Sequence, residues 1–189
     1  MRVATFFGTT LALTAGIGGL AAQVACAIQL RDGTVYFAYP PRLVKATATY
    51  NSAGVWGLAT YYFTFSLPQN AGEPLGRVTI TQQLGADNIH FDLEDSRAFV
   101  GTRNRKGPRL TLGEVTRDGE KKTVSVTFEP PVTPGKTVTI GLRPVRNPRV
   151  PGVYLFGVTA FPVGEKSHGQ FVGYGRIHFY GGGRKPFGG

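Results

Sequence analysis

The sequence contains a single cysteine, Cys26, among its 189 residues. One cysteine cannot form an intramolecular disulfide, so the small disulfide-stapled scaffolds of many secreted domains are excluded. A chain of this length suits one domain, and it buries enough apolar surface to fold without such crosslinks.

Acidic side chains are also scarce, with 11 Asp and Glu against 21 Lys and Arg, and the formal net charge is +10. Arg2 is the one charged residue of segment 1–27, so the remainder of the chain carries +9. An excess of this size favours solubility and non-specific attraction to polyanions, and it says nothing about the fold.

Residues typical of metal and catalytic sites are few and scattered. The three histidines, His90, His168 and His178, lie on separate segments, and alternation with Arg176 and Tyr180 places His178 toward solvent. No Gly-x-Ser-x-Gly sequence occurs, which excludes the nucleophile elbow of the α/β-hydrolases. We therefore predict no cofactor and no metal site.

The first 27 residues have the pattern of a secretory signal peptide. Arg2 supplies the positive start, Val3–Leu20 is apolar and uncharged, and Ala25-Cys26-Ala27 is a small-residue cleavage site. We expect a signal helix that is cleaved after this triplet and an exported mature protein. One alternative is a short membrane anchor that stays uncut. Another is cleavage before the cysteine with lipidation of its thiol, although Gln23 stands where a lipoprotein signal has an aliphatic residue.

Short alternating segments separated by turn residues make up the rest of the chain, and none has the period of an amphipathic helix. Alternation of apolar and polar residues is typical of strands with one buried face. We predict strands over 34–39, 43–50, 56–67, 75–83, 89–93, 110–116, 123–129, 136–143, 153–162 and 171–180. In the hairpin turn at Asp118-Gly119, we expect the glycine to supply a positive φ. The pattern predicts an all-β domain over 28–180, an antiparallel Greek-key, immunoglobulin-like β-sandwich, with a disordered glycine-rich tail over 181–189.

The last two strands predict a hairpin at the centre of the core. In Val153–Pro162, alternation places Tyr154, Phe156, Val158 and Ala160 on one face. In Phe171–Tyr180, the corresponding face holds Phe171, Gly173, Gly175, Ile177 and Phe179. We expect Phe156 and Phe179 to be buried.

Several long segments carry a resemblance to a known family, among them DGTVYFAYPPRLVKATATYN, FDLEDSRAFVG and GVYLFGVTAFPVGEK. From about Gln29 to Tyr180, the chain resembles a cyanobacterial secreted family of unknown function. The resemblance implies an exported single-domain protein of the periplasm, thylakoid lumen or cell envelope. It implies no catalytic residues.

Asp87, Asp92, Glu94 and Asp95 form an acidic cluster. Their oxygens are of the type that binds calcium, but their spacing is not that of an EF-hand loop. We favour a polar loop in which Asp92 or Asp95 caps a helical turn over Ser96–Phe99. An alternative function is an envelope glycan-acting enzyme that uses carboxylates of the Asp87–Asp95 segment as acid and base.

Two basic segments are the candidate anion-binding residues. The candidates are Arg103, Arg105 and Lys106 in a predicted loop, and Arg143, Arg146 and Arg149 in the extended segment RPVRNPR. A polyproline II segment of that period presents its three arginines on one side, and the planar guanidinium group matches carboxylate, sulfate and phosphate. The alternative is that one or two of these arginines pair internally with Asp92, Glu94 or Asp95.

Loops of a β-sandwich gather at its two ends, so the two basic segments form one patch if they share an end. The sequence thus predicts a non-enzymatic exported protein that binds acidic polysaccharide, anionic lipid headgroups or an envelope protein. We expect no nucleic-acid partner, because the polyanions available to an exported protein are phospholipid headgroups, acidic polysaccharide and lipopolysaccharide.

Overall fold

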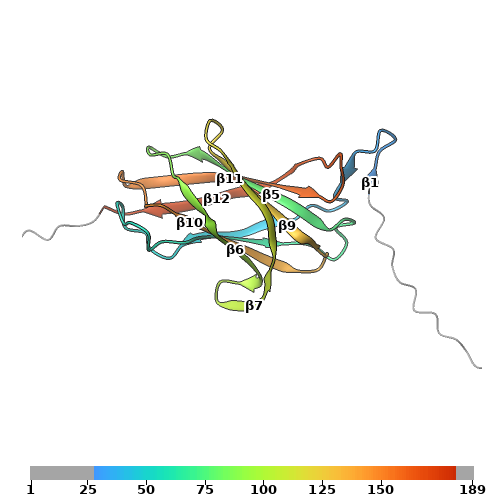
Figure 1. The fold of residues 1–189 in the computed structure, drawn as a ribbon, viewed down its shortest axis with the longest axis horizontal. Coiled ribbons are helices and arrows are strands. Elements are labelled where there is room, and N and C mark those ends of the chain that lie inside the picture. Colours follow the sequence, from blue (N-terminus) through green and yellow to red (C-terminus); the bar gives the residue numbers. More distant parts are fainter. Residues whose placement is uncertain (1–27, 182–189) are drawn as a thin grey trace, which may run out of the picture.

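The computed structural model describes residues 28–181, and these residues form two antiparallel five-stranded sheets packed face to face (Figure 1). The predicted signal peptide 1–27 and the predicted tail beyond Gly181 lie outside the described residues. Within the described range, no helix has the length and apolar character needed to span a membrane.

The first sheet has the strand order β3-β4-β10-β6-β7. Its strands are β3 (Arg42–Ala48), β4 (Tyr61–Ser66), β10 (Thr137–Pro144), β6 (Phe91–Thr102) and β7 (Arg105–Leu110). The second sheet has the order β12-β11-β5-β9-β8. Its strands are β12 (Gln170–Phe179), β11 (Gly152–Pro162), β5 (Leu75–Leu84), β9 (Thr123–Val132) and β8 (Leu112–Asp118). A short pair, β1 (Ile28–Gln29) with β2 (Val35–Tyr36), precedes them. The predicted all-β, immunoglobulin-like β-sandwich is confirmed.

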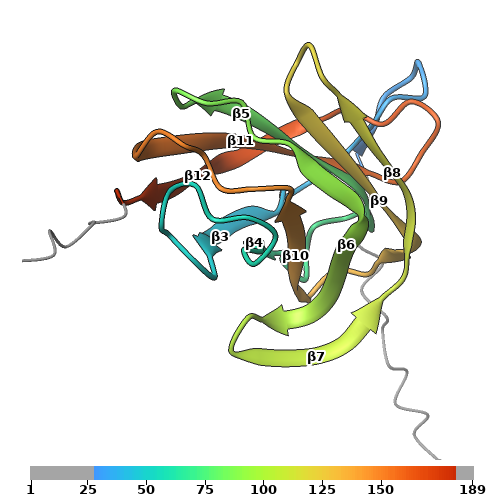
Figure 2. The same cartoon turned by 60° about the vertical axis from the view of Figure 1, so that its left-hand side comes forward.

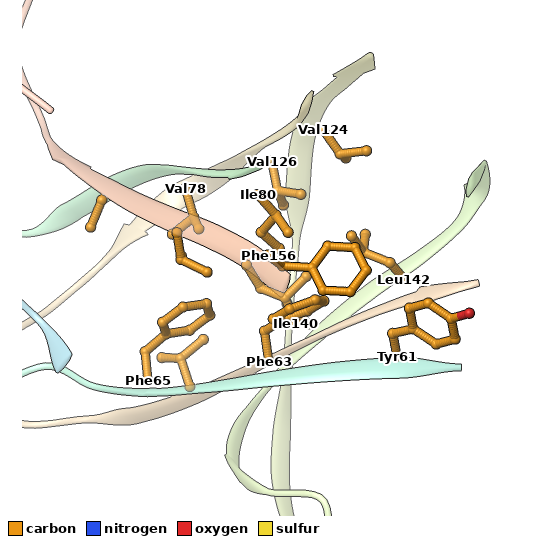
Figure 3. Packing of buried hydrophobic residues seen from close by; sticks show 14 of the residues in the cluster. Tyr61, Phe63, Phe65, Val78, Ile80, Val124, Val126, Ile140, Leu142 and Phe156 are labelled. Atoms are coloured by element: carbon orange, nitrogen blue, oxygen red, sulfur yellow. The ribbon is translucent and has the colours of Figure 1, made fainter. Parts of the chain in front are cut away.

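The core lies between the inner faces of the two sheets. β4 contributes Tyr61, Phe63 and Phe65, which alternate with outward-facing residues as the sequence predicts. The Phe63 and Phe156 rings meet edge to face with their centres 5.6 Å apart, which joins the two sheets (Figure 3). The predicted burial of Phe156 and Phe179 is confirmed, at 1% and 0% exposure.

The prediction that Phe171 points into the core is wrong, because its side chain is 55% exposed. The pairing of β11 with β12 shifts between Val158 and Thr159, and Gly173 adopts a φ of 135° beside this shift. A bulge inserts one extra residue and so reverses which face the following side chains occupy. Val172 packs against the core in place of Phe171.

Three further predictions of local structure are corrected. β4 begins at Tyr61, so Trp56–Thr60 is loop and not strand. Ser96–Phe99 belongs to β6, so the predicted helical turn does not form. In the β8–β9 turn, the positive φ belongs to Lys122, at 52°, and not to Gly119. Ser96–Phe99 forms a strand because its pairing with β10 outweighs the local preference of its polar residues for a turn.

Candidate binding site

Three loops meet at one end of the sandwich, where β3, β5 and β10 finish. They are loops 49–60, 85–90 and 145–151 (Figure 1). The third loop lies between the other two, because Gly57 donates its amide to the Val145 carbonyl at 3.1 Å and Val145 donates to the His90 carbonyl at 2.8 Å. Backbone hydrogen bonds thus join the three loops to one another.

Trp56 and Arg146 form a stacked pair on these loops. The two residues form an antiparallel bridge, which places their side chains on the same face. The Arg146 guanidinium carbon lies 5.4 Å from the centre of the indole ring, within the range of a cation–π contact. Trp56, the only tryptophan in the sequence, remains 65% exposed. The pair therefore presents an aromatic ring and a cation to solvent side by side.

Asn147 fixes the backbone next to this pair and is fully buried. Its side-chain oxygen accepts a hydrogen bond from the Tyr61 hydroxyl at 3.0 Å, and its side-chain nitrogen donates to the carbonyls of Tyr50, at 3.0 Å, and Ser52, at 2.9 Å. Burial, with a smaller contribution from nearby Tyr154, raises the pKa of Tyr61 far above its ordinary value. The hydroxyl therefore stays protonated and remains a donor.

A second polar cluster holds loop 85–90. Gln82, buried on β5, accepts from the Ile89 amide at 2.9 Å and donates to the Asp87 carbonyl at 2.6 Å. The Asp87 carboxylate accepts hydrogen bonds from the backbone amides of Arg149 and Val150. Side chains that satisfy backbone groups in this way keep a loop in one conformation, because an unpaired buried group is costly.

A cavity of about 300 Å³ opens between the loops. Its lining includes Trp56, Asn88, His90, Val145, Arg146 and Pro148. The lining combines the indole face, apolar contact surface and side chains that donate hydrogen bonds. It also includes Asp87, whose carboxylate already accepts hydrogen bonds from the Arg149 and Val150 amides. Such a mixture suits a polar ligand with ring faces, because the aromatic face packs on the ring while the polar groups set its orientation.

The three predicted arginines of the segment RPVRNPR have different environments. Arg143 pairs with the Asp95 carboxylate and donates from Nε to the Gly57 carbonyl at 3.1 Å, as the internal-pairing alternative describes. Arg146 stacks on Trp56. Arg149 has an exposed side chain. Arg143 lies within β10, so the three arginines do not form one polyproline II ridge.

The other predicted basic residues, Arg103, Arg105 and Lys106, lie at or just beyond the far end of β6. Arg143 pairs with Asp92, near the start of β6. Arg103 instead comes directly after Thr102, the last residue of β6. Arg105 and Lys106 then begin β7. The structure therefore does not bring the two basic segments together into one patch, and it places Arg103, Arg105 and Lys106 at a hairpin tip.

The acidic residues do not share one cleft. Asp87 holds loop 145–151, Asp95 pairs with Arg143, and Asp92 and Glu94 are exposed on β6. Within residues 28–181, no group of three or more His, Cys, Asp and Glu side chains is close enough together to hold a metal ion. The geometry thus gives no specific support to the alternative of paired catalytic carboxylates.

Sequence reasoning missed two residues of the loop site, Trp56 and Asn147. Trp56 resembled the first residue of a long aromatic strand, and its position between Gly54 and Gly57 was the available signal for a loop. Asn147 lies inside a proline-bounded segment whose arginines were the more conspicuous feature. Its burial depends on Tyr61, which is 86 positions away in the sequence.

Fold and site together define an all-β, immunoglobulin-like domain with a structured loop surface. The chain belongs to the family described as "Protein of unknown function (DUF2808)", whose model matches residues 34–179. No curated protein matches the chain.

Among solved structures, the chain is similar to a fragment of the major pilin GBS80 of Streptococcus agalactiae, with 12% identity and a TM-score of 0.44, over 74% of this chain and 56% of that one. It is similar to BcpA, the major pilin subunit of Bacillus cereus, with 11% identity and a TM-score of 0.44, over 74% and 40%. It is also similar to the collagen-binding domain of a Staphylococcus aureus adhesin, with 12% identity and a TM-score of 0.36, over 71% and 97%. The chain spans about half the length of the first two structures that it matches, a streptococcal antigen I/II-family domain and the GBS80 pilin, at 46% and 56%.

Proposed function

We propose that this protein is an exported, non-enzymatic binding module of the cell envelope that recognises acidic polysaccharide through the Trp56–Arg146 pair. The single observation that carries the proposal is that stacked pair, exposed beside a cavity of mixed polar and apolar lining, on loops that buried side chains hold in place.

The chemistry of the pair supports a sugar ligand. The negative face of the indole ring attracts the weakly positive C–H edges of a sugar ring, which also displace water from its surface. Arg146 adds a guanidinium group beside that face, and this group matches a uronate carboxylate or an ester oxyanion. A neutral polysaccharide can stack on the indole ring but offers Arg146 no anionic partner.

The architecture around the pair supports binding over catalysis. Asn147, Gln82 and Asp87 fix the three loops, so the site loses little conformational freedom when a ligand binds. The excess of basic over acidic residues adds long-range attraction to a polyanion. The signal-peptide pattern of residues 1–27 is consistent with an encounter outside the inner membrane.

The test is a calorimetric titration with polygalacturonate as the acidic polymer and dextran as the neutral one. We expect binding to polygalacturonate alone, and we expect Trp56→Ala and Arg146→Ser each to weaken it by roughly tenfold or more, since each removes one stacking or charge-assisted contact. Arg149→Ser is the matched control, because it removes the same charge from the same loop.

Equal loss in Arg146→Ser and Arg149→Ser would show that only net charge matters, and the stacked site would be rejected. Anionic phospholipid vesicles serve as a second ligand. Tight binding to vesicles with none to either polysaccharide would contradict the proposal and indicate a membrane-surface protein.

A further inference from the structure

A second cationic site lies on the outer face of the first sheet, where the β6–β7 hairpin curls over β3 and β4 (Figure 2). Pairing between β6 and β7 shifts between Phe99 and Gly101, and Gly101 has a φ of 96°. A bulge of this kind bends the hairpin and increases its twist. As a result, the Arg103 guanidinium at the hairpin tip reaches the Ala48 carbonyl of β3, with 3.4 Å between Nη1 and the oxygen.

Two guanidinium groups gather around one tyrosine ring at this place. The guanidinium carbons of Arg97 and Arg103 lie 5.7 and 5.5 Å from the centre of the Tyr62 ring. Arg97 also donates from Nη2 to the Tyr62 hydroxyl at 2.9 Å and to the Thr60 hydroxyl at 3.0 Å. The ring contacts hold both cations at the surface in defined positions.

Among residues 28–181, no carboxylate forms an ion pair with Arg97 or Arg103, and Asp95, which lines a surface pocket with Arg97, pairs with Arg143. Lys106 stacks on Phe99 close by, with 5.6 Å between its ammonium nitrogen and the ring centre. Like charges held together without a counter-ion repel one another, so an anion that enters between them gains free energy.

A groove of about 250 Å³ opens between the hairpin tip and β3. Its lining includes Lys45, Thr47, Thr64, Thr102, Arg103 and Asn104, with no acidic residue. Thr64 forms the floor and is 5% exposed. Thr139 donates its hydroxyl proton to the Gly101 carbonyl at 2.7 Å, so in the 2.9 Å contact between the two threonine hydroxyls Thr64 is the donor. The floor is therefore polar and internally satisfied.

The groups that remain available to a ligand come from opposite walls of the groove. Lys45 provides an ammonium group from β3, and Arg103 and Asn104 provide guanidinium and amide N–H groups from the hairpin tip. Donors that converge from several directions match an anion with oxygens in several directions. A tetrahedral oxyanion has that form, and a planar carboxylate does not.

We propose that this groove binds a tetrahedral oxyanion group, a sulfate or phosphate ester on a larger molecule, with Lys45 and Arg103 as its charged contacts. The site is separate from the Trp56–Arg146 pair and does not depend on it. If both sites bind the same polymer, that polymer carries sulfate or phosphate esters as well as acidic sugar rings.

The test is a nuclear magnetic resonance titration of the isotope-labelled full chain with sodium sulfate, sodium phosphate and sodium acetate at one fixed ionic strength. We expect saturable shifts at the amides of Thr47, Thr64 and Asn104 with sulfate, phosphate or both, and weaker, non-saturating shifts with acetate. A response to sulfate alone assigns a sulfate ester, and a response to phosphate alone assigns a phosphate ester.

Two variants and one control make the result specific. Lys45→Ser and Arg103→Ser should each weaken the apparent affinity by roughly tenfold, because each removes a charge-assisted contact. Arg77→Ser should leave it unchanged, although Arg77 stacks on Phe161 at 4.2 Å in the same manner on the opposite sheet. Arg103→Lys checks folding, since it keeps the charge and should retain part of the affinity.

Equal shifts with all three anions, or shifts that persist in Lys45→Ser and Arg103→Ser, would overturn the proposal. Fluorescence of Trp56 reports the loop site alone, so loss of one site is distinguishable from loss of the other.

Discussion

The Tyr61 hydroxyl donates to the side-chain oxygen of Asn147 across 3.0 Å, and both residues are fully buried. This bond joins the first residue of β4 to the loop that carries Arg146. Since Asn147 also donates to two carbonyls of loop 49–60, one side chain connects the core with both halves of the loop site.

The Asn147→Ala substitution should therefore lower both stability and binding. It leaves the buried Tyr61 hydroxyl without a partner, which should cost about 1–3 kcal/mol, and it removes two hydrogen bonds to carbonyls of loop 49–60. Urea unfolding measures the change in free energy. Asn104→Ala, at the exposed hairpin tip, is the control and should change stability by no more than about 0.5 kcal/mol. Equal effects in the two variants would show that the buried network is not important.

Phe156→Ala and Phe171→Ala test the assignment of faces in the β11–β12 hairpin. Phe156 is buried against Phe63, and its loss should cost about 3–5 kcal/mol. Phe171 is exposed beyond the bulge, so its loss should cost less than about 1 kcal/mol. Chemical denaturation of both variants gives the comparison. A large cost at Phe171 would mean that alternation continues through Gly173 without a bulge.

These two phenylalanines show what the sequence can and cannot predict. Alternation correctly places Tyr61, Phe63 and Phe156 in the core, because side chains on a regular strand point to opposite faces in turn. It fails at Phe171, because a bulge changes the count by one residue and leaves no unambiguous mark in the sequence. The binding site is less predictable still, since Trp56 meets Arg146, ninety positions later, only once the strands have paired.

Stability should fall at alkaline pH. Burial raises the pKa of Tyr61 and of Tyr154, so the folded state holds their protons more tightly than the unfolded state does. Their contribution is complete below about pH 10, the ordinary tyrosine pKa, and is lost as the pH rises above it. We expect a slope of up to about 1.4 kcal/mol per pH unit for each residue.

Urea unfolding between pH 8 and pH 11.5 measures this slope. Tyr61→Phe should reduce it, and Tyr39→Phe, at an exposed position, should not. An unchanged slope in Tyr61→Phe would mean that another group controls alkaline unfolding.

Gly101→Ala should destabilise the β6–β7 hairpin. A φ of 96° is unfavourable for alanine, and the added Cβ would lie 2.2 Å from the Arg105 carbonyl oxygen. We expect a cost of about 1–3 kcal/mol together with weaker anion binding at Lys45 and Arg103. Gly54→Ala is the control, because Gly54 also has a positive φ, of 74°, but its added Cβ meets no atom within 4 Å. Anion affinity that is unchanged in Gly101→Ala would show that the bulge does not position the tip.

The most direct test of the central claim uses the fluorescence of Trp56, because it is the only tryptophan in the chain and forms the proposed sugar-binding surface. Titration with polygalacturonate at low ionic strength should give a saturable change in its emission. Dextran should give no such change. The apparent affinity should fall by roughly tenfold or more in Arg146→Ser. Added salt should weaken binding, since screening shortens the range of the charge contacts to about 8 Å at physiological ionic strength. Emission that does not respond to polygalacturonate while calorimetry detects binding would contradict the account, because the polymer would then be bound elsewhere on the protein.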